Sequence, residues 1–254
     1  MVLQSNDSSA TDYALKPWPR QIVVVGCGGV GSYLIPALLR TVRDHKNPEE
    51  SPEIILVDGD ILEQKNMDRQ LFDEKHIGIK KSEAMHAAYL KYYGPRLQHI
   101  PEFFHGTEMW LKQYSLLFAC VDNHPGRSRC FTAADNTSSD VIMCGNGYTD
   151  AEAQYYTSMW RNTKRDPRVM FPEILRDRTD DPISREGGCT GEAQESTPQL
   201  AIANLCAATY ALHLLWYYYQ EEHKMDADAQ PFGPIRHASN FSRVFSVRHK
   251  EVDV

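Results

Sequence analysis

The chain has 254 residues, of which 42% are hydrophobic and 24% charged, a balance that fits one large soluble α/β domain or two small ones. The formal net charge of −7 argues against a nucleic-acid partner, because nucleic-acid binding requires a basic face. The six cysteines form no CxxC pair, which argues against a disulfide framework and a cysteine-rich zinc site and favours a reducing, cytoplasmic location.

Strand and helix patterns alternate through the first half of the chain. Residues 1–19 lack the basic start and apolar run of a signal peptide and are expected to be a flexible tail. Residues 20–254 are expected to be a single domain. Strands are predicted at residues 21–26, 53–60, 98–104, 115–123 and 140–147, and helices between them at 26–45, 81–94 and 125–139. Alternating buried strands and helices predict an α/β, Rossmann-like, doubly wound parallel sheet.

The pattern changes after about residue 150. A strand-like segment at 151–160 has no helix before it, so the sheet is expected to become mixed, and 241–247 is predicted as a closing strand. Residues 161–191 are expected to form a long loop and a candidate lid. The apolar segment 200–219 approaches membrane-spanning length, but polar residues such as Asn204 interrupt it and acidic residues follow it, which favours a helix in a core or a subunit interface.

A glycine-rich turn lies between the first strand and the first helix. Gly26, Gly28 and Gly31 fit the GxGxxG pattern in the strand–turn–helix context that it needs. Glycines allow close backbone approach, and the helix N-terminus offers unpaired N–H groups to a phosphate. The turn fits NAD, FAD or ATP equally, and it could serve packing alone. Asp58, at the end of the second strand, stands where a ribose-binding carboxylate is expected, so a nicotinamide dehydrogenase is still possible at this point.

Further polar residues follow the strand ends. They are Asp60, Asn66, Arg69, Gln70 and Lys81, with Asp122 and Asn123 after the fourth strand. At one edge of a sheet they would supply cations for a triphosphate, a carboxylate for Mg²⁺ and amide donors, the set that nucleotidyl transfer from ATP requires. Hydride transfer would not use two cations aimed at a polyphosphate. Each residue also has a simpler interpretation as a turn residue, a surface ion-pair partner or a helix cap.

The order GxGGxGS, DxD, N-x-x-RQ, IGxxK and DN resembles the adenylating domain of the ThiF/MoeB/HesA family, relatives of ubiquitin-activating enzymes. The resemblance covers roughly residues 20–220. The short form, with GCGGVGS and VDGD, also resembles more loosely the ThiF-like proteins of the bacterial PRTRC gene system.

The resemblance implies a role for each matching residue. The nucleotide turn would comprise Gly26, Gly28, Gly29 and Gly31; Asp58 would hold the ribose; Asn66, Arg69 and Lys81 would contact the phosphates, with Asp60, Gln70 and Asn123 nearby; and Asp122 would bind Mg²⁺. The implied reaction is attack of a C-terminal carboxylate on the α-phosphorus of ATP, which gives an acyl-adenylate and pyrophosphate. The implied partner is a ubiquitin-like protein, or a peptide, that ends in Gly.

Two further features bear on the resemblance. Cys189 stands where some relatives carry a cysteine that takes the acyl group as a thioester, although nothing in the sequence indicates a lowered thiol pKa. Cys27 and Cys120 are interpreted as buried residues. The two CxxC pairs of zinc-binding relatives are missing, so no structural zinc is expected. The arginine that reaches a partner subunit's ATP in many relatives has no counterpart, although the 200–219 helix still suggests a homodimer.

Three alternatives stay open from the sequence. The first is an NAD-dependent oxidoreductase that uses the same glycine turn. The second is a non-catalytic nucleotide-binding scaffold. The third is an adenylating enzyme with another acceptor, such as a peptide carboxylate or a modified tRNA base, the latter disfavoured by the acidic charge.

Overall fold

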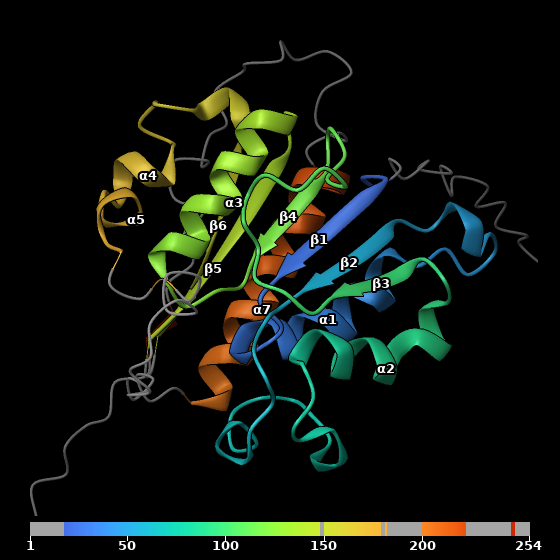
Figure 1. The fold of residues 1–254 in the computed structure, drawn as a ribbon. Helices are drawn as coiled ribbons and strands as arrows, with labels where there is room; N and C mark the ends of the chain where they lie inside the picture. The colour runs from blue at the N-terminus through green and yellow to red at the C-terminus, as the bar shows by residue number, and fades with distance from the viewer. Residues whose placement is uncertain (1–17, 148–149, 179–180, 182–199, 222–244, 247–254) are drawn as a thin grey trace, which may run out of the picture.

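The computed structural model describes residues 18–147, 150–178, 181, 200–221 and 245–246. They form one seven-stranded sheet in the order β3-β2-β1-β4-β5-β6-β7 (Figure 1). The strands are β1 Gln21–Val25, β2 Glu53–Val57, β3 Leu97–Ile100, β4 Leu116–Ala119, β5 Asp140–Asn146, β6 Asp150–Thr157 and β7 Phe245–Ser246. The first five are parallel, and β6 pairs antiparallel with β5 and with β7. The predicted Rossmann-like sheet, parallel first and mixed later, is confirmed.

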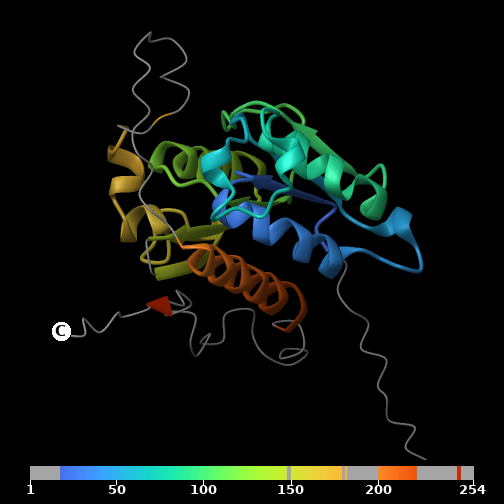
Figure 2. The ribbon, with the colours of Figure 1, turned by 90° about the horizontal axis from the view of Figure 1, so that it is seen from below.

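Helices cover both faces of the sheet (Figures 1 and 2). The α-helices are α1 Gly29–Val42, α2 Lys81–Tyr93, α3 His124–Thr137, α4 Pro167–Met170, α5 Glu173–Arg176 and α7 Ala201–Trp216, the last continued by a π-turn at Tyr217–Glu221. Short 3₁₀ turns lie at Pro48–Glu50, Gln64–Asn66, Glu74–His76 and Ser158–Trp160. Side chains of α1, α2 and α7 pack against one face, and those of α3 and α5 against the other.

The central strand shows why the first apolar run folds as it does. All five residues of β1 are buried, with Ile22 and Val24 in one core cluster and Val23 and Val25 in the other. A strand with helices on both faces buries both sets of alternating side chains, so β1 is apolar after Gln21 and rich in β-branched residues. The sheet therefore gives a rigid base to the loops at its carboxyl edge.

Several element boundaries differ from the expected ones, and two of the differences have a clear physical reason. β3 ends at Ile100 because Pro101, the next residue, has no N–H to donate to a ladder. Residues 161–178, predicted as part of a long loop, contain the one-turn helices α4 and α5, each of which begins beside a proline. The rest of that region lies almost wholly outside the described residues. Residues 1–17 of the predicted 1–19 tail also lie outside them, whereas Trp18 packs against the core.

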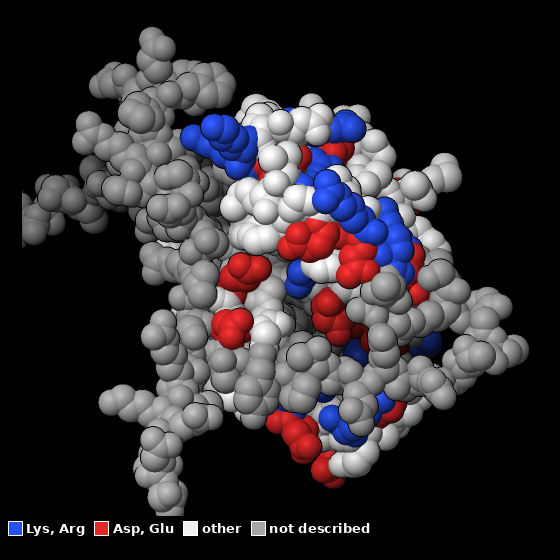
Figure 3. Space-filling model, turned by 90° about the vertical axis from the view of Figure 1, so that its left-hand side faces the viewer, with Lys and Arg blue, Asp and Glu red and all other residues white. Residues whose placement is uncertain are grey.

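The described residues also show whether any helix could span a membrane and how charged side chains are distributed on one face. No helix in it is long and apolar enough to cross a lipid bilayer. On the face shown in Figure 3, the Lys and Arg side chains of the described residues stand among Asp and Glu side chains rather than forming one broad basic area.

Candidate functional site

The glycine turn lies at the carboxyl edge of the sheet, between the ends of β1 and β4. Strand order reverses there, with β2 on one side of β1 and β4 on the other, which is where doubly wound sheets bind ligands. Gly26 has φ +91°, and a Cβ on it would lie 2.8 Å from the Cys120 carbonyl oxygen. A Cβ on Gly28 would instead face the side chains of Gln70 and Lys81, at 3.5 and 3.7 Å. The turn therefore points its open side toward the predicted polar residues.

Asp58 fastens the turn to the end of β2. Its carboxylate accepts hydrogen bonds from the backbone N–H of Cys27 at 2.6 Å and of Asp60 at 2.8 Å. Burial raises the pKa of Asp58 to about 6, against the opposing effect of the Lys81 ammonium. This carboxylate sits beside the start of α1, as the ribose-binding role of the sequence prediction requires.

The pKa of Asp58 leads to a test with adenosine, which carries no phosphate to titrate. An ionised carboxylate accepts hydrogen bonds from ribose hydroxyls, and the acid form accepts them less well. We expect adenosine to bind about tenfold more weakly at pH 5 than at pH 7, because Asp58 titrates at about 6. Calorimetry measures this, and Asp58→Asn should bind weakly at both values. Equal affinity of the wild type at pH 5 and pH 7 would rule out the assigned role.

Lys81 begins α2 and points into the same region. Its ammonium lies 2.9 Å from the Asp60 carboxylate, and the residue is only 7% exposed. Burial alone would lower the pKa of Lys81, but the carboxylates of Asp58, Asp60 and Asp122 outweigh it and raise the pKa above its ordinary value. Lys81 is therefore a held cation near the phosphate-binding turn. Its interaction with Asp122 brings the residue after β4 into the same electrostatic environment.

Between β2 and α2, Asn66 has a hydrogen-bond partner within its own turn, whereas Gln70 has a buried polar atom without one in the described part of the chain. The Asn66 side-chain oxygen accepts from the Glu63 N–H at 2.9 Å in a capping box, which gives Asn66 a local structural role beside any ligand contact. Gln70 is buried, and its Oε1 has no hydrogen-bond partner in the described part of the chain. Arg69 is partly buried, and its carbonyl accepts from Asn204. The amide nitrogen of Gln70 lies nearest Gly28, and the unpaired amide oxygen of the same side chain suits a ligand that supplies a donor.

Asp122 and Asn123 follow β4. Asn123 caps α3, since its side-chain oxygen accepts from the Gly126 N–H at 2.8 Å, so the capping interpretation is correct. Asp122 is exposed at the edge of the sheet. The described residues contain no group of three or more His, Cys, Asp or Glu side chains suited to a metal. A magnesium ion that is held mainly by substrate phosphates needs only one or two protein carboxylates, so Asp122 alone fits that chemistry.

The cysteines near the turn are not reactive groups. Burial raises the pKa of the Cys27 thiol well above its ordinary value, with Asp58 adding to the effect, and the pKa of Cys120 is raised by its hydrogen bond to Cys144 and by burial. Both thiols belong to the core, as expected from the sequence. Cys189, proposed as the acceptor of an acyl group, lies outside the described residues.

Asn204 belongs to the site, although its sequence position marked it only as an interruption of an apolar run. Fully buried in α7, it donates to the Arg69 carbonyl at 3.0 Å and accepts from the Asn146 side chain at 2.8 Å. Its amide also lies against Gly29, where an added Cβ would approach within 2.6 Å. Asn204 therefore joins α7 to the glycine turn, the Arg69 loop and β5. A polar residue at the start of a buried helix was the only signal.

Removing this amide should cost stability. Asn204→Ala breaks two hydrogen bonds and leaves their partly buried partners, the Arg69 carbonyl and the Asn146 amide, unpaired, so we expect the free energy of unfolding to fall by about 1–3 kcal/mol. The exposed Thr209, on the same helix, is the matched control, and Thr209→Ala should change the value by less than about 0.5 kcal/mol. Denaturant titration measures both. Equal losses in the two variants would contradict the linking role of Asn204.

Comparisons with known proteins identify the family and the fold of this chain. The ThiF family model matches residues 18–234. The E. coli MccB structure with ATP matches with a TM-score of 0.55 at 19% identity, over 78% of this chain and 55% of that chain. The PaaA structure matches with a TM-score of 0.51 at 15% identity, also over 78% and 55%. The chain thus spans little more than half the length of these solved proteins, and at such identities the likeness shows the fold. No curated protein matches the sequence.

Proposed function

Because the chain belongs to the ThiF family, we propose that it is an ATP-dependent adenylating enzyme that activates a C-terminal carboxylate as an acyl-adenylate. The observation that carries the proposal is the meeting of three features at one sheet edge. These are the glycine turn at the start of α1, the buried Asp58 beside it, and the buried Lys81 cation facing Gly28.

Each described residue would then have a defined part in binding ATP. Asp58 accepts from the ribose hydroxyls, and the first N–H groups of α1 face the phosphates with the positive end of the helix dipole. Lys81 and Arg69 supply positive charge to the triphosphate, and the unpaired Gln70 oxygen accepts from a donor group of the ligand. Asp122 would hold Mg²⁺, which supplies charge neutralisation at the phosphates when it is bound.

Alignment and electrostatics would supply most of the catalysis. A carboxylate is a poor nucleophile toward an anionic phosphate, so the cations must reduce the repulsion between them. The carboxylate oxygen bonds to the α-phosphorus, the bond from that phosphorus to the oxygen bridging to the β-phosphate breaks, and pyrophosphate leaves. Because both reactants are bound at the sheet edge, their reaction becomes effectively unimolecular, which lowers the entropic part of the barrier.

The acyl substrate is proposed to be the C-terminus of a ubiquitin-like protein or of a peptide ending in Gly. Solved structures of E. coli MccB include complexes with ATP and with MccA, and the fold shared with MccB supports a substrate of that kind here. We also propose that the acyl group is transferred to Cys189 and that the chain forms a homodimer through the α7 region. We propose a cytoplasmic location as well.

Ligand-dependent thermal unfolding tests the nucleotide specificity. Ligand at about a hundred times its dissociation constant adds roughly 2.7 kcal/mol to the free energy of unfolding. We expect ATP with Mg²⁺ to raise Tm and NAD to leave it unchanged, and the ATP effect to shrink in Arg69→Ala and Asp122→Ala. Stabilisation by NAD and not by ATP would overturn the proposal in favour of an oxidoreductase. Stabilisation by ATP without any pyrophosphate release from substrates would favour a scaffold.

A further inference from the structure

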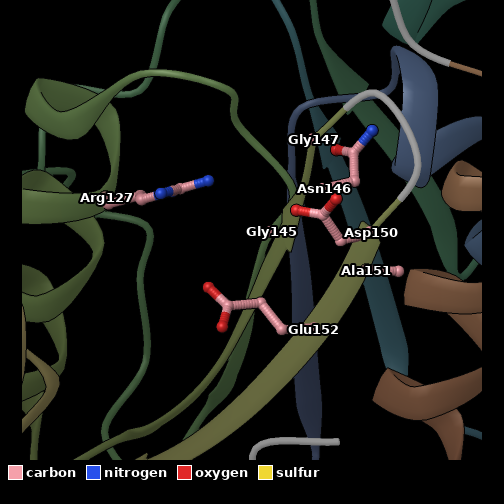
Figure 4. A pocket seen from close by; sticks show the side chains of 7 residues that line it. All are labelled: Arg127, Gly145, Asn146, Gly147, Asp150, Ala151 and Glu152. Carbon is pink, nitrogen blue, oxygen red and sulfur yellow. The ribbon is translucent and has the colours of Figure 1, made fainter. Parts of the chain in front are cut away.

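A hollow of about 180 Å³ lies at the turn between β5 and β6, and neither the sequence motifs nor the proposed nucleotide site accounts for it. Its polar walls are Arg127 from α3, Asn146 from the end of β5, and Asp150 and Glu152 from β6 (Figure 4). The volume is more than ten times the roughly 15 Å³ that one water molecule requires. The hollow is therefore large enough for part of a substrate.

Two hydrogen-bonded connections place the hollow beside the nucleotide site. The Asn146 side chain donates to Asn204 at 2.8 Å, and Asn204 packs against Gly29 of the nucleotide turn. On the other wall, Nε of Arg127 donates to the carbonyl of Val121, the residue before Asp122, at 3.3 Å. A group in the hollow thus lies next to the residues assigned to the phosphates and to Mg²⁺, the place where an acyl substrate must arrive.

Arg127 and Glu152 face the hollow from opposite sides (Figure 4). Among the described residues, the Arg127 guanidinium donates hydrogen bonds only to the Val121 and Cys144 carbonyls, at 3.3 and 3.4 Å. Both distances are long for such bonds, and a guanidinium has five N–H donors. Glu152 makes no hydrogen bond or ion pair within the described part of the chain, although it is partly buried. Burial also raises the pKa of its carboxyl, against the lowering effect of Arg127. The pair leaves a donor and an acceptor facing one space.

Gly145 gives Glu152 its position. The two residues are opposite each other in the antiparallel pairing of β5 and β6, and a Cβ on Gly145 would lie 2.9 Å from Oε1 of Glu152. The described walls carry one cation and two carboxylates, which disfavours a triphosphate in the hollow. A neutral group that both accepts and donates a hydrogen bond suits it better, and a peptide unit is such a group, with its carbonyl and N–H on opposite sides.

We propose that this hollow binds the last peptide unit of the acyl substrate, with Arg127 donating to the carbonyl and Glu152 accepting from the N–H. The inference rests on the proposed function and adds two positioning residues for the last peptide unit of the protein or peptide substrate, a unit that small carboxylic acids lack. Arg127 and Glu152 would position the terminal carboxylate without taking part in bond formation.

The test compares hexapeptides of randomised sequence that end in Gly-Gly with matched depsipeptides, in which an ester oxygen replaces the last peptide N–H. The measurement is kcat/KM for peptide-dependent release of pyrophosphate by the full chain. The ester has no N–H to donate to Glu152, and hydrogen bonds to charged groups contribute more free energy than neutral ones. The ester should therefore lower kcat/KM about tenfold or more in the wild type. Glu152→Ala should lower kcat/KM for the amide peptides by a similar factor and show no further loss with the ester.

Two variants distinguish substrate positioning by Glu152 from a purely structural role of this residue. Glu152→Gln keeps an acceptor oxygen and should recover most of the activity that Glu152→Ala loses, while Glu102→Ala, at an exposed position, should match the wild type. Stabilisation by ATP should be the same in all of them.

Three results would overturn the inference: ester and amide substrates of equal activity in the wild type, an ester effect that persists in Glu152→Ala, or activity with small carboxylic acids but not with peptides. Absence of ATP binding would instead count against the proposed function itself.

Discussion

Replacing Lys81 with methionine is expected to lower the rate of acyl-adenylate formation by two to three orders of magnitude while the fold is retained. Methionine keeps the length and apolar stem of lysine but removes the charge, and losing one preorganised group that stabilises developing charge typically costs about 10²–10³ in rate. The accompanying loss of stability should be small, because the Asp60 partner of Lys81 has 53% of its side chain exposed to water.

Lys91 provides the matched control for this variant. It lies on the same helix, α2, but is exposed near the other end. Lys91→Met should therefore keep the wild-type rate of pyrophosphate release and the wild-type Tm. If Lys81→Met retains more than about a tenth of the wild-type rate, the lysine is a structural ion-pair partner of Asp60 and not a phosphate ligand.

Gly31→Ala should be the most damaging single change to the nucleotide turn. A Cβ at this position would lie 2.0 Å from the Gly26 carbonyl oxygen, a backbone atom that cannot move without shifting β1 or α1. Overpacking of this kind costs about 1–3 kcal/mol or more, and we expect a loss at the upper end because both neighbours belong to buried elements. Displacing the start of α1 should also abolish stabilisation by ATP.

Gly78→Ala separates the clash from backbone strain. Gly78 has φ +93°, but nothing lies within 4 Å of an added Cβ. Its substitution should cost only the strain of a left-handed residue, about 1–2 kcal/mol, and leave ATP binding intact. Urea denaturation of the two variants gives the comparison. A loss in Gly31→Ala no greater than in Gly78→Ala would show that the turn can relax, which would remove the steric argument for glycine.

The architecture could be predicted from the sequence because buried strands have a mainly apolar, β-branched composition that is easy to recognise. The β-branched runs of β1 and β2 are buried on both faces, and the glycine turn stands out between β1 and α1, where a Cβ on Gly26 or Gly31 would clash with backbone atoms. Both features could therefore be predicted from the sequence. The end of β3 was predicted too late, because its apolar pattern continues to Phe104 whereas Pro101 ends the ladder. Pattern and hydrogen bonding disagreed there, and hydrogen bonding decided the boundary.

The candidate site was only partly readable. Asp58 and Lys81 follow or begin regular elements, so their meeting at one sheet edge could be inferred from topology. Asn204, Arg127 and Glu152 could not be placed in that way. Their neighbours are distant in sequence, 135 residues in the case of Asn204 and Arg69, and a single amide in an apolar helix gives no indication of its partners. Asn66 was predicted from the sequence as a phosphate contact, but its side chain also completes a local capping box, which the sequence pattern did not indicate.

The central claim is that this chain joins ATP to a terminal carboxylate. The most direct measurement incubates the full chain with ATP, Mg²⁺ and the randomised Gly-Gly-ended hexapeptides, and follows pyrophosphate together with the mass of the peptide products. We expect pyrophosphate and peptidyl-AMP from peptides with a free carboxyl group, and neither product when the same peptides are amidated at the C-terminus. Pyrophosphate release that does not depend on the carboxyl group, or release of phosphate and ADP instead, would contradict the account.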